Sequence, residues 1–220
     1  IVAIQEFSYV SKPSTTVQMR SFVNAAFGTN YVYARETNAS YSVPNGIVSR
    51  HPILASGSWE DHDPGVNDRG FAWARIALPG TNELYVVSVH LKASSGSSNE
   101  ARRAAEAAEL KALISTNFPS NAWIIVAGDM NLYSDSEGAI TTFKTFLSDS
   151  PVPTDTESEG SNATNEGRTQ RYDRVLVSFS LTNCLTNVVI GSRSFPNGLV
   201  FDSAVYVLAT NLHISIQNAE

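Results

Sequence analysis

The sequence contains one cysteine, Cys184, among 220 residues. No disulfide can form within the chain, so the cysteine count does not indicate whether the protein works in an oxidising or a reducing compartment. The apolar neighbours of Cys184 favour a small buried side chain over a reactive thiol. The chain also lacks an apolar stretch long enough to cross a bilayer as a helix, and it does not begin with a basic-then-apolar signal segment. We therefore expect no membrane partner.

Positive charge is scarce as well. The chain carries 15 Lys and Arg against 21 Asp and Glu, which gives a formal net charge of −6. This argues against a protein that binds nucleic acid through a broadly basic surface. A nuclease is not excluded, because a divalent metal brings its own positive charge and a few arginines can contact phosphates locally. The many Ser, Thr, Asn and Gly residues, with little Lys, fit a secreted protein.

The length fits a single domain over residues 1–220 with a sizeable core. Short β-branched segments separated by Pro or Gly predict strands near 1–6, 31–35, 46–50, 71–77, 84–90, 123–128, 172–178, 185–190, 199–206 and 212–217. Helices are predicted over 16–26, 99–117 and 137–147, and the polar segment 149–170 is predicted to be a surface loop. Strands outnumber helices, which favours an α/β sandwich with mixed sheets.

The helix over 99–117 has the clearest pattern. Ser98 is the expected N-cap, and several alanines give the segment high helix propensity. Leu110 and Ile114 belong to its apolar stripe, whereas Glu106 and Lys111 are predicted to face solvent.

The most informative stretch is IIVAGDMNLYS, residues 124–134. Its apolar run stops at Gly128, and Asp129 and Asn131 follow. This is the pattern of a buried strand that presents a polar pair at its carboxyl end, with Gly128 letting the backbone leave tightly. A carboxylate beside an amide suits a hard cation and a phosphate. An Asx turn explains an isolated Gly-Asp-x-Asn equally well.

Other predicted strands also end in polar residues. Glu6 ends IVAIQE and His90 ends LYVVSVH; Arg69 and Asp173 precede strands, and His213 lies in the segment LHISI. Alone, each has an ordinary explanation, such as a solvated strand end, a hydrogen-bonded core histidine or a turn. Sites are often built at strand ends in sheet-rich folds. Together these residues therefore favour metal-assisted attack of water on a phosphoester.

The chain contains five characteristic segments in this order: IVAIQE, NGIVSRHPI, YVVSVHL, IIVAGDMN and YDRVLVS. Together they resemble the endonuclease/exonuclease/phosphatase superfamily with the deoxyribonuclease I-like fold, specifically its bacterial nuclease branch. The resemblance covers essentially the whole chain. It implies a four-layered α/β sandwich of two mixed, mostly antiparallel β-sheets flanked by helices. It also implies phosphodiester hydrolysis by in-line attack of water with Mg²⁺ or Mn²⁺, with Ca²⁺ as a further candidate.

The resemblance implies roles for individual residues. Glu6 would ligate the metal. His90 would contact the scissile phosphate or protonate the leaving oxygen. Asp129 would position or deprotonate the attacking water, and Asn131 would hold a phosphate oxygen. Asn45 would orient His90, although the Asn-Gly dipeptide that starts there is equally well explained as a turn.

Two further roles concern the end of the chain. Asp173 would hydrogen-bond His213 and fix its tautomer, and His213 would act as a general base or as a cationic stabiliser of the transition state. The family's usual Ser-Asp-His corresponds here to Asn211, Leu212 and His213, and a leucine cannot bind an ion. The chain is also predicted to lack the family's first strand and helix. Arg69 is predicted to bind phosphate.

DNA is the predicted substrate, cut without sequence preference through backbone contacts, and RNA or other phosphoesters are alternatives. The candidate phosphate contacts are basic residues: Arg50, Arg69, Lys92, Arg168 and Arg171. We expect a monomer. Two other function classes stay open: a phosphodiesterase or phosphatase of the same fold acting on lipid or small phosphoesters, and a binding module with impaired catalysis. Leu212 and the missing first strand favour the last of these.

Overall fold

The computed structural model describes residues 1–11, 14–37, 43–61, 69–80 and 82–201. The chain divides into two compact units. The larger consists of Ile1–Ser150 with Arg171–Leu185, and the smaller of Pro151–Gln170 with the chain from Thr186 onward. Of the predicted site residues that the structure describes, all belong to the larger unit except Arg168, a candidate phosphate contact in the smaller one.

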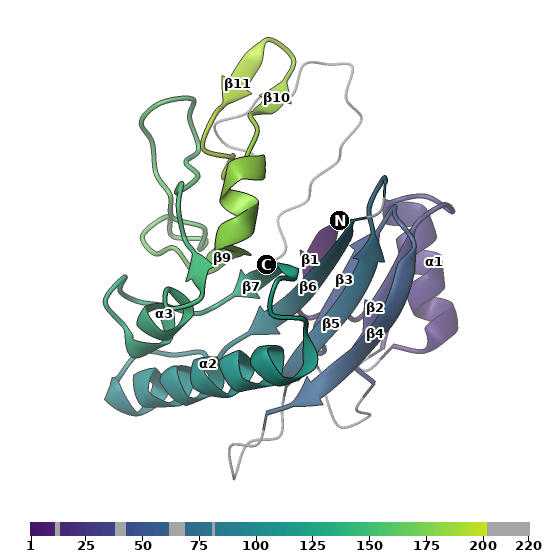
Figure 1. Ribbon diagram of the computed structural model, residues 1–220, viewed down its shortest axis with the longest axis horizontal. Coiled ribbons are helices and arrows are strands. Elements are labelled where there is room, and N and C mark those ends of the chain that lie inside the picture. Colours follow the sequence, from purple (N-terminus) through teal and green to yellow (C-terminus); the bar gives the residue numbers. More distant parts are fainter. Residues whose placement is uncertain (12–13, 38–42, 62–68, 81, 202–220) are drawn as a thin grey trace. The chain divides into compact units, whose positions relative to one another are not determined.

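Two sheets form the centre of the larger unit (Figure 1). The six-stranded sheet contains, in spatial order, β4 (Ile53–Glu60), β5 (Gly70–Ala77), β6 (Glu83–His90), β7 (Trp123–Asp129), β9 (Asp173–Ser178) and β8 (Leu147–Ser148). Strands β6 and β7 are parallel and the other neighbours are antiparallel. The three-stranded antiparallel sheet has the order β1 (Val2–Ile4), β3 (Gly46–Ser49), β2 (Val32–Arg35).

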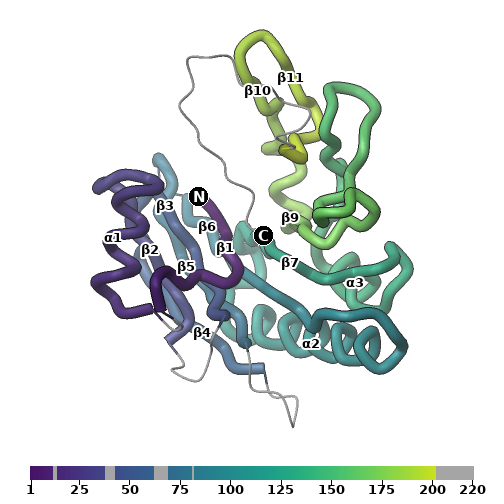
Figure 2. The backbone as a smooth tube through the Cα atoms, turned by 180° about the vertical axis from the view of Figure 1, so that it is seen from behind, coloured from purple at the N-terminus to yellow at the C-terminus, as the bar shows by residue number. Residues whose placement is uncertain are grey.

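Helices cover the outer faces of the two sheets. Helix α1 (Thr16–Ala26) lies beside the smaller sheet, whereas α2 (Ser97–Asn117) and α3 (Gly138–Phe143) cover the larger one, as the views from both sides show (Figure 2). Three apolar cores fill the three interfaces. One joins Met19 and Val23 of α1 to Val48; one joins Ile47 to Ile76 between the sheets; and one lies beneath α2 and α3. The predicted four-layered sandwich is confirmed.

Capping chemistry explains where α1 begins. The Thr15 side chain accepts a hydrogen bond from the Gln18 backbone N–H at 3.2 Å, and the Gln18 side chain accepts one from the Thr15 N–H at 2.7 Å. This reciprocal pair satisfies two donors that the first turn leaves open. Helix α2 differs from the prediction, because it begins at Ser97 after Gly96 and Ser98 is not its cap. The Glu106 side chain is also buried and does not face solvent.

Strand β4 was not predicted from the sequence. Its segment contains Gly57 and serines, which have low strand propensity. The indole of Trp73 on β5 lies where a Gly57 side chain would stand, with ring atoms 3.0 Å from an added Cβ. The glycine therefore serves cross-strand packing. The short β8 was also missed, and Cys184 is exposed at the end of a 3₁₀ helix (Phe179–Cys184), contrary to the prediction.

The smaller unit has little regular structure. Its described part contains the hairpin β10 (Val188–Ile190) and β11 (Arg193–Phe195) and a bridge between Thr154 and Leu199. An ion pair of 2.6 Å joins Arg168 to Asp155. Of the predicted strand 199–206, residues 199–201 form none, and its remainder lies outside the described residues, as does 212–217. The single domain over 1–220 stays a prediction. Among the described residues, no helix has the length and apolarity needed to cross a membrane.

Candidate active site

His90 and Asp129 stand side by side where the parallel strands β6 and β7 end. The strand register pairs the two residues, and His90 Nε2 lies 3.6 Å from Asp129 Oδ2. The Leu91 N–H donates to the Asp129 carbonyl at 2.9 Å, which prolongs the pairing by one residue. The histidine side chain is buried and the aspartate side chain is 27% exposed, so solvent reaches the carboxylate. The carboxyl edge of the sheet therefore holds an acid–base pair.

Asp173 faces Asp129 from the other side. It is the first residue of β9, and the antiparallel register of β7 and β9 places it opposite Asp129. Burial, followed by the negative charge of Asp173, raises the pKa of Asp129 to about 6. The Asn131 backbone N–H and the Arg69 charge act in the opposite direction on this pKa. His90, Asp129 and Asp173 thus form a row across three neighbouring strands.

The Asp129–Asn131 pair does form an Asx turn. The Asn131 N–H donates to Asp129 Oδ1 at 2.9 Å, and Asn131 has a φ of +49°. The same turn brings the Asn131 side chain against the loop after β6, where its Nδ2 donates to the Leu91 carbonyl at 3.0 Å. The turn and the site interpretations therefore describe one structure. The turn is what directs the amide toward the strand that carries His90.

Gly128 has a different role from the one predicted. It is an interior residue of β7, and the strand continues through Asp129. Its φ is +148°, and a Cβ there would lie 2.0 Å from the Val89 carbonyl oxygen and 2.7 Å from Gln5 Nε2. The glycine is required because β6 and the end of β1 approach the backbone closely.

Arg69 reaches the same edge of the sheet. Its Nη1 donates to the Leu91 carbonyl at 3.2 Å, so this oxygen accepts hydrogen bonds from both Arg69 and Asn131. Burial raises the pKa values of Asp129, Glu36 and Glu106, and the Arg69 charge acts against each of these increases. Arg69 therefore contributes positive charge that partly compensates these carboxylates.

Glu6 follows β1 and is exposed, with a φ of +52°. The end of β1 is tied to β6, because Gln5 Nε2 donates to Ser88 Oγ at 3.0 Å and Ser88 Oγ donates to the Ile4 carbonyl at 3.1 Å. The Glu6 charge contributes to the raised pKa of Asp129. The structure thus brings the predicted metal ligand within electrostatic reach of the row on β6, β7 and β9.

Asn45 is fully buried just before β3. Its Nδ2 donates to the Gly70 carbonyl at 2.8 Å, and its backbone N–H donates to Glu36 Oε2 at 2.6 Å. Burial raises the pKa of Glu36 to about 7. Asn45 therefore holds the segment that follows Arg69. Gly46 is already part of a strand, so the turn interpretation is wrong, and the orientation of His90 by Asn45 stays a prediction.

The remaining predictions concern the end of the chain and Arg171. His213, with Asn211 and Leu212, lies outside the described residues. Arg171 is buried, and its two terminal guanidinium nitrogens donate to Asp149 at 2.6 and 3.2 Å. It is therefore not the DNA contact that the sequence predicted. The interaction between Asp173 and His213 stays a prediction.

Residues 1–193 match the model of the Endonuclease/Exonuclease/phosphatase family. The chain belongs to this family. Membership suggests metal-dependent phosphoester hydrolysis, and enzymes of the family generally depend on divalent metals. A search of curated proteins found no match.

Solved structures of the family share the fold. A Beutenbergia cavernae endonuclease/exonuclease/phosphatase is 12% identical with a TM-score of 0.56, and the match covers 84% of this chain and 55% of that one. A family protein from Bacteroides thetaiotaomicron is 16% identical, with a TM-score of 0.52 and coverages of 75% and 65%. A humanised D. rerio TDP2 is 15% identical, with a TM-score of 0.52 and coverages of 80% and 66%. The chain thus spans between about half and two thirds of these proteins.

The carboxylates of Glu6, Asp129 and Asp173 interact electrostatically at this edge of the sheet, where the family's divalent metal would need oxygen ligands. Within the described ranges, no group of three or more His, Cys, Asp or Glu side chains could hold an ion. Mg²⁺, however, is commonly bound by only one or two carboxylates together with water and substrate phosphates. The charges of Glu6 and Asp173 both raise the pKa of Asp129, and a cation there would relieve that repulsion. Metal binding by Glu6 stays a prediction.

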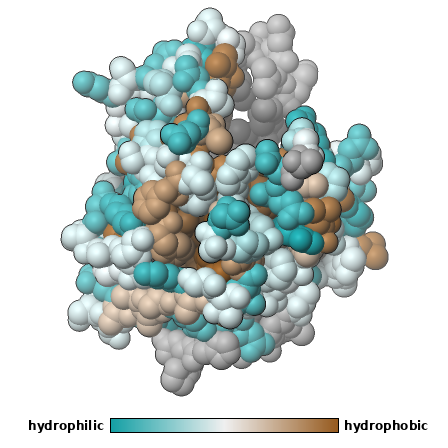
Figure 3. All heavy atoms as spheres, viewed as in Figure 1, coloured by the Kyte–Doolittle hydropathy of each residue, from teal (hydrophilic) through white to brown (hydrophobic). Residues whose placement is uncertain are grey.

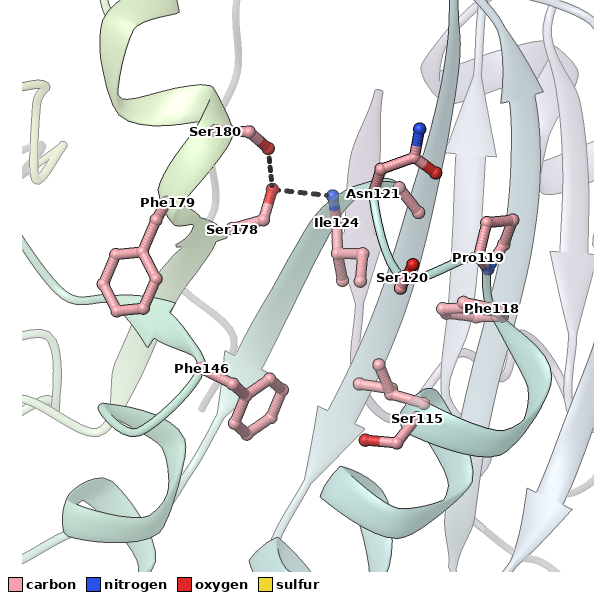
Figure 4. Close-up of a pocket in the computed structure, with 12 residues that line it drawn as sticks. Ser115, Phe118, Pro119, Ser120, Asn121, Ile124, Phe146, Ser178, Phe179 and Ser180 are labelled. Atoms are coloured by element: carbon pink, nitrogen blue, oxygen red, sulfur yellow. Dashed lines mark hydrogen bonds between the residues drawn. The ribbon is translucent and has the colours of Figure 1, made fainter.

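An apolar pocket of about 460 Å³ lies at the other end of β7 (Figure 4). The rings of Phe118, Phe146 and Phe179 surround it, and Ser178 Oγ accepts a hydrogen bond from the Ile124 N–H at 3.1 Å. No ionisable side chain lines it. Ile124 and Asp129 are separated by about 17 Å of extended strand. The pocket is therefore not part of the charged site. Apolar side chains also gather on the face of the molecule that Figure 3 shows.

Sequence reasoning missed Arg103, Glu106 and Glu137, which lie beneath the site and are all buried. Arg103 occupies the same helical stripe as Leu110 and Ile114. A charged residue in an apolar stripe was the available signal, because a buried guanidinium requires nearby acceptors.

Proposed function

We propose that this chain hydrolyses the phosphodiester bonds of DNA, without sequence preference, in a reaction that depends on Mg²⁺ or Mn²⁺. The proposal rests on the row of His90, Asp129 and Asp173 at paired positions of three strands. The site thus combines groups that can move protons and neutralise the charge of a phosphate: an imidazole, a carboxylate of raised pKa and an arginine.

The arrangement supports a division of tasks. Asp129 Oδ1 is occupied by the Asn131 N–H, while Oδ2 faces His90. With a pKa of about 6, Asp129 is largely ionised at neutral pH and suits the acceptance of a proton from the attacking water. His90 would contact the scissile phosphate or protonate the leaving oxygen. Asn131 and Arg69 would hold the phosphate oxygens.

The metal would supply the positive charge that polarises the phosphate and stabilises the leaving oxygen. Glu6 would hold it. DNA is proposed as the substrate because YDRVLVS resembles the nuclease branch of the family. The composition fits a secreted protein, and we also expect a monomer; both properties stay predictions.

A plasmid-nicking assay tests the proposal. The wild-type protein is incubated with supercoiled plasmid in Mg²⁺, Mn²⁺, Ca²⁺ or EDTA, beside the variant Asp129→Asn. Glu100→Gln is the matched control. Glu100 is exposed on α2, so this substitution removes one negative charge outside the site. We expect nicking by wild type and control with Mg²⁺ or Mn²⁺, and none with EDTA or with Asp129→Asn.

Other outcomes would point elsewhere. Nicking that persists in EDTA would contradict a metal-dependent reaction. Cleavage of sphingomyelin or inositol phosphates without cleavage of DNA would favour a lipid or small-phosphoester hydrolase. Retained DNA binding in a fluorescence anisotropy assay, without hydrolysis of any substrate, would favour a binding module.

A further inference from the structure

Arg103 on α2 is a fully buried charged residue that contacts the loop after β6. Its Nη1 donates to the carbonyl oxygens of Lys92 and Ser94, each at 2.9 Å. Its Nε donates to Glu137 Oε2 at 2.8 Å. The loop that it contacts begins directly after His90. A buried cation on α2 thus holds the backbone that leaves the histidine strand.

Glu137 connects the same cation to the loop after β7. Its second carboxylate oxygen, Oε1, accepts the Tyr133 backbone N–H at 2.7 Å. The Arg103 guanidinium also lies over the Tyr133 ring, 5.5 Å from the ring centroid. Tyr133 is two residues beyond Asn131, in the segment that leaves Asp129. The Arg103–Glu137 pair therefore contacts both loops that carry predicted site residues.

A second α2 residue completes the support of the first loop. Glu106 Oε2 accepts the Lys92 N–H at 2.9 Å, so the Lys92 peptide N–H and the Lys92 carbonyl are both held by α2. Between these anchors and His90 lies Leu91, whose carbonyl accepts the Asn131 amide. The two loops are thus joined directly at Leu91 and through the buried pair behind it.

We propose that Arg103 and Glu137 are positioning residues that fix His90 and Asn131 relative to each other. The inference rests on the proposed hydrolysis at this site. Replacing a buried ion pair by apolar side chains of similar volume is often neutral for stability or favourable. Stability alone therefore does not explain a buried pair whose remaining hydrogen bonds all go to these two loops. Small displacements of reacting groups, in contrast, are costly for catalysis.

The double variant Arg103→Met/Glu137→Leu separates the two roles. We expect a folded protein by circular dichroism, with a melting temperature near that of wild type. We expect kcat for plasmid nicking to fall by about 10- to 100-fold, with a smaller change in KM. Hydrogen exchange followed by mass spectrometry should become faster in residues 91–95 and 131–137.

The control is Arg75→Met/Glu83→Leu, which removes an ion pair of the same residue types at the other end of β6, where the two side chains are 3.5 Å apart. It should leave kcat and loop exchange unchanged. A folded Arg103→Met/Glu137→Leu protein with wild-type kcat and wild-type loop exchange would overturn the inference.

Two further experiments cover a double variant that does not fold and a wild-type protein that is inactive. If the double variant does not fold, Arg103→Lys replaces it, because lysine keeps the charge but has one nitrogen and cannot donate to Glu137 and to the two carbonyls from separate nitrogens, as Nε and Nη1 of Arg103 do. A reduced kcat at an unchanged melting temperature supports the inference, and a wild-type kcat overturns it. If wild type hydrolyses nothing, the proposed function fails by itself. Loop exchange in the variant then decides the positioning role: faster exchange supports it and unchanged exchange overturns it.

Discussion

Asp129 and Asp173 face each other across β7 and β9, two carboxylates at one paired position of adjacent antiparallel strands. Like charges at such positions repel and are destabilising, and carboxylates with perturbed pKa values cluster at functional sites. The pairing explains part of the raised pKa of Asp129 and joins β9 to the edge formed by β6 and β7. The pKa of Asp129 therefore reports on the interaction between the two carboxylates.

Replacing Asp173 by asparagine should lower the pKa of Asp129. Burial is the larger cause of the raised pKa and stays in place, so we expect a value below about 6 but above the ordinary aspartate range. A ¹³C NMR titration of the Asp129 carboxyl group measures this directly. An unchanged or higher pKa in Asp173→Asn would contradict the coupling between the two residues.

Asp129→Asn should strongly reduce activity while preserving the fold. An asparagine oxygen can still accept the Asn131 N–H, so the Asx turn should remain, but the group that accepts a proton is lost. We expect kcat to fall by about 10²- to 10⁴-fold, the usual contribution of general acid–base catalysis. The melting temperature should stay close to that of wild type. Residual activity within a factor of two would remove Asp129 from the chemistry.

Stability should fall as pH rises, in part because of Glu106. Burial raises the pKa of Glu106 from 4.5 to about 7 in the folded state. Its contribution to stability is therefore fully present below pH 4.5 and is lost as pH rises through about 7. Glu106→Gln should remove a contribution on the order of 1–3 kcal/mol between these pH values. Denaturation curves of both proteins at each pH measure the difference, and identical pH dependences would contradict it.

Asp149 should be among the most sensitive residues for stability. Its buried carboxylate pairs with Arg171 and, at 2.8 Å, with Arg174, and both guanidinium groups are themselves buried. Asp149→Asn removes the buried negative charge that both guanidinium groups share, so the free energy of unfolding should fall by about 3–5 kcal/mol. Asp135 also pairs with Arg174 but is 63% exposed, and Asp135→Asn should cost less than about 1 kcal/mol. Urea denaturation compares the two variants, and equal effects would contradict the difference in burial.

Gly128 should not tolerate a side chain. In Gly128→Ala the new Cβ would overlap the Val89 carbonyl, which should destabilise the protein by about 1–3 kcal/mol or more. Gly80 is the matched control: it also has a positive φ, +89°, but an added Cβ meets nothing within 4 Å. Gly80→Ala should therefore show only the backbone strain, about 1 kcal/mol. Thermal denaturation of both variants should separate the strain from the overlap.

Local patterns in the sequence were sufficient for much of the fold. The apolar run before Gly128, the run before His90 and the capping residues of α1 each depend on neighbours within a few positions. Strand β4 escaped prediction because its glycine is explained by Trp73 on another strand. The solvent-facing position predicted for Glu106 is wrong because its partner is also distant in the sequence. That partner, Lys92, lies in a loop that sequence periodicity does not describe.

The sequence by itself determined which polar residues stand at the strand ends, because strand length and turn residues are encoded locally. Only the tertiary structure decided which of them meet. The register of β6 with β7 and of β7 with β9 brings His90, Asp129 and Asp173 into one row, and register depends on contacts between distant segments. The same holds for Arg103, whose partner Glu137 is 34 positions away. A buried charge can be read in a sequence, but its partner is chosen by how the layers pack.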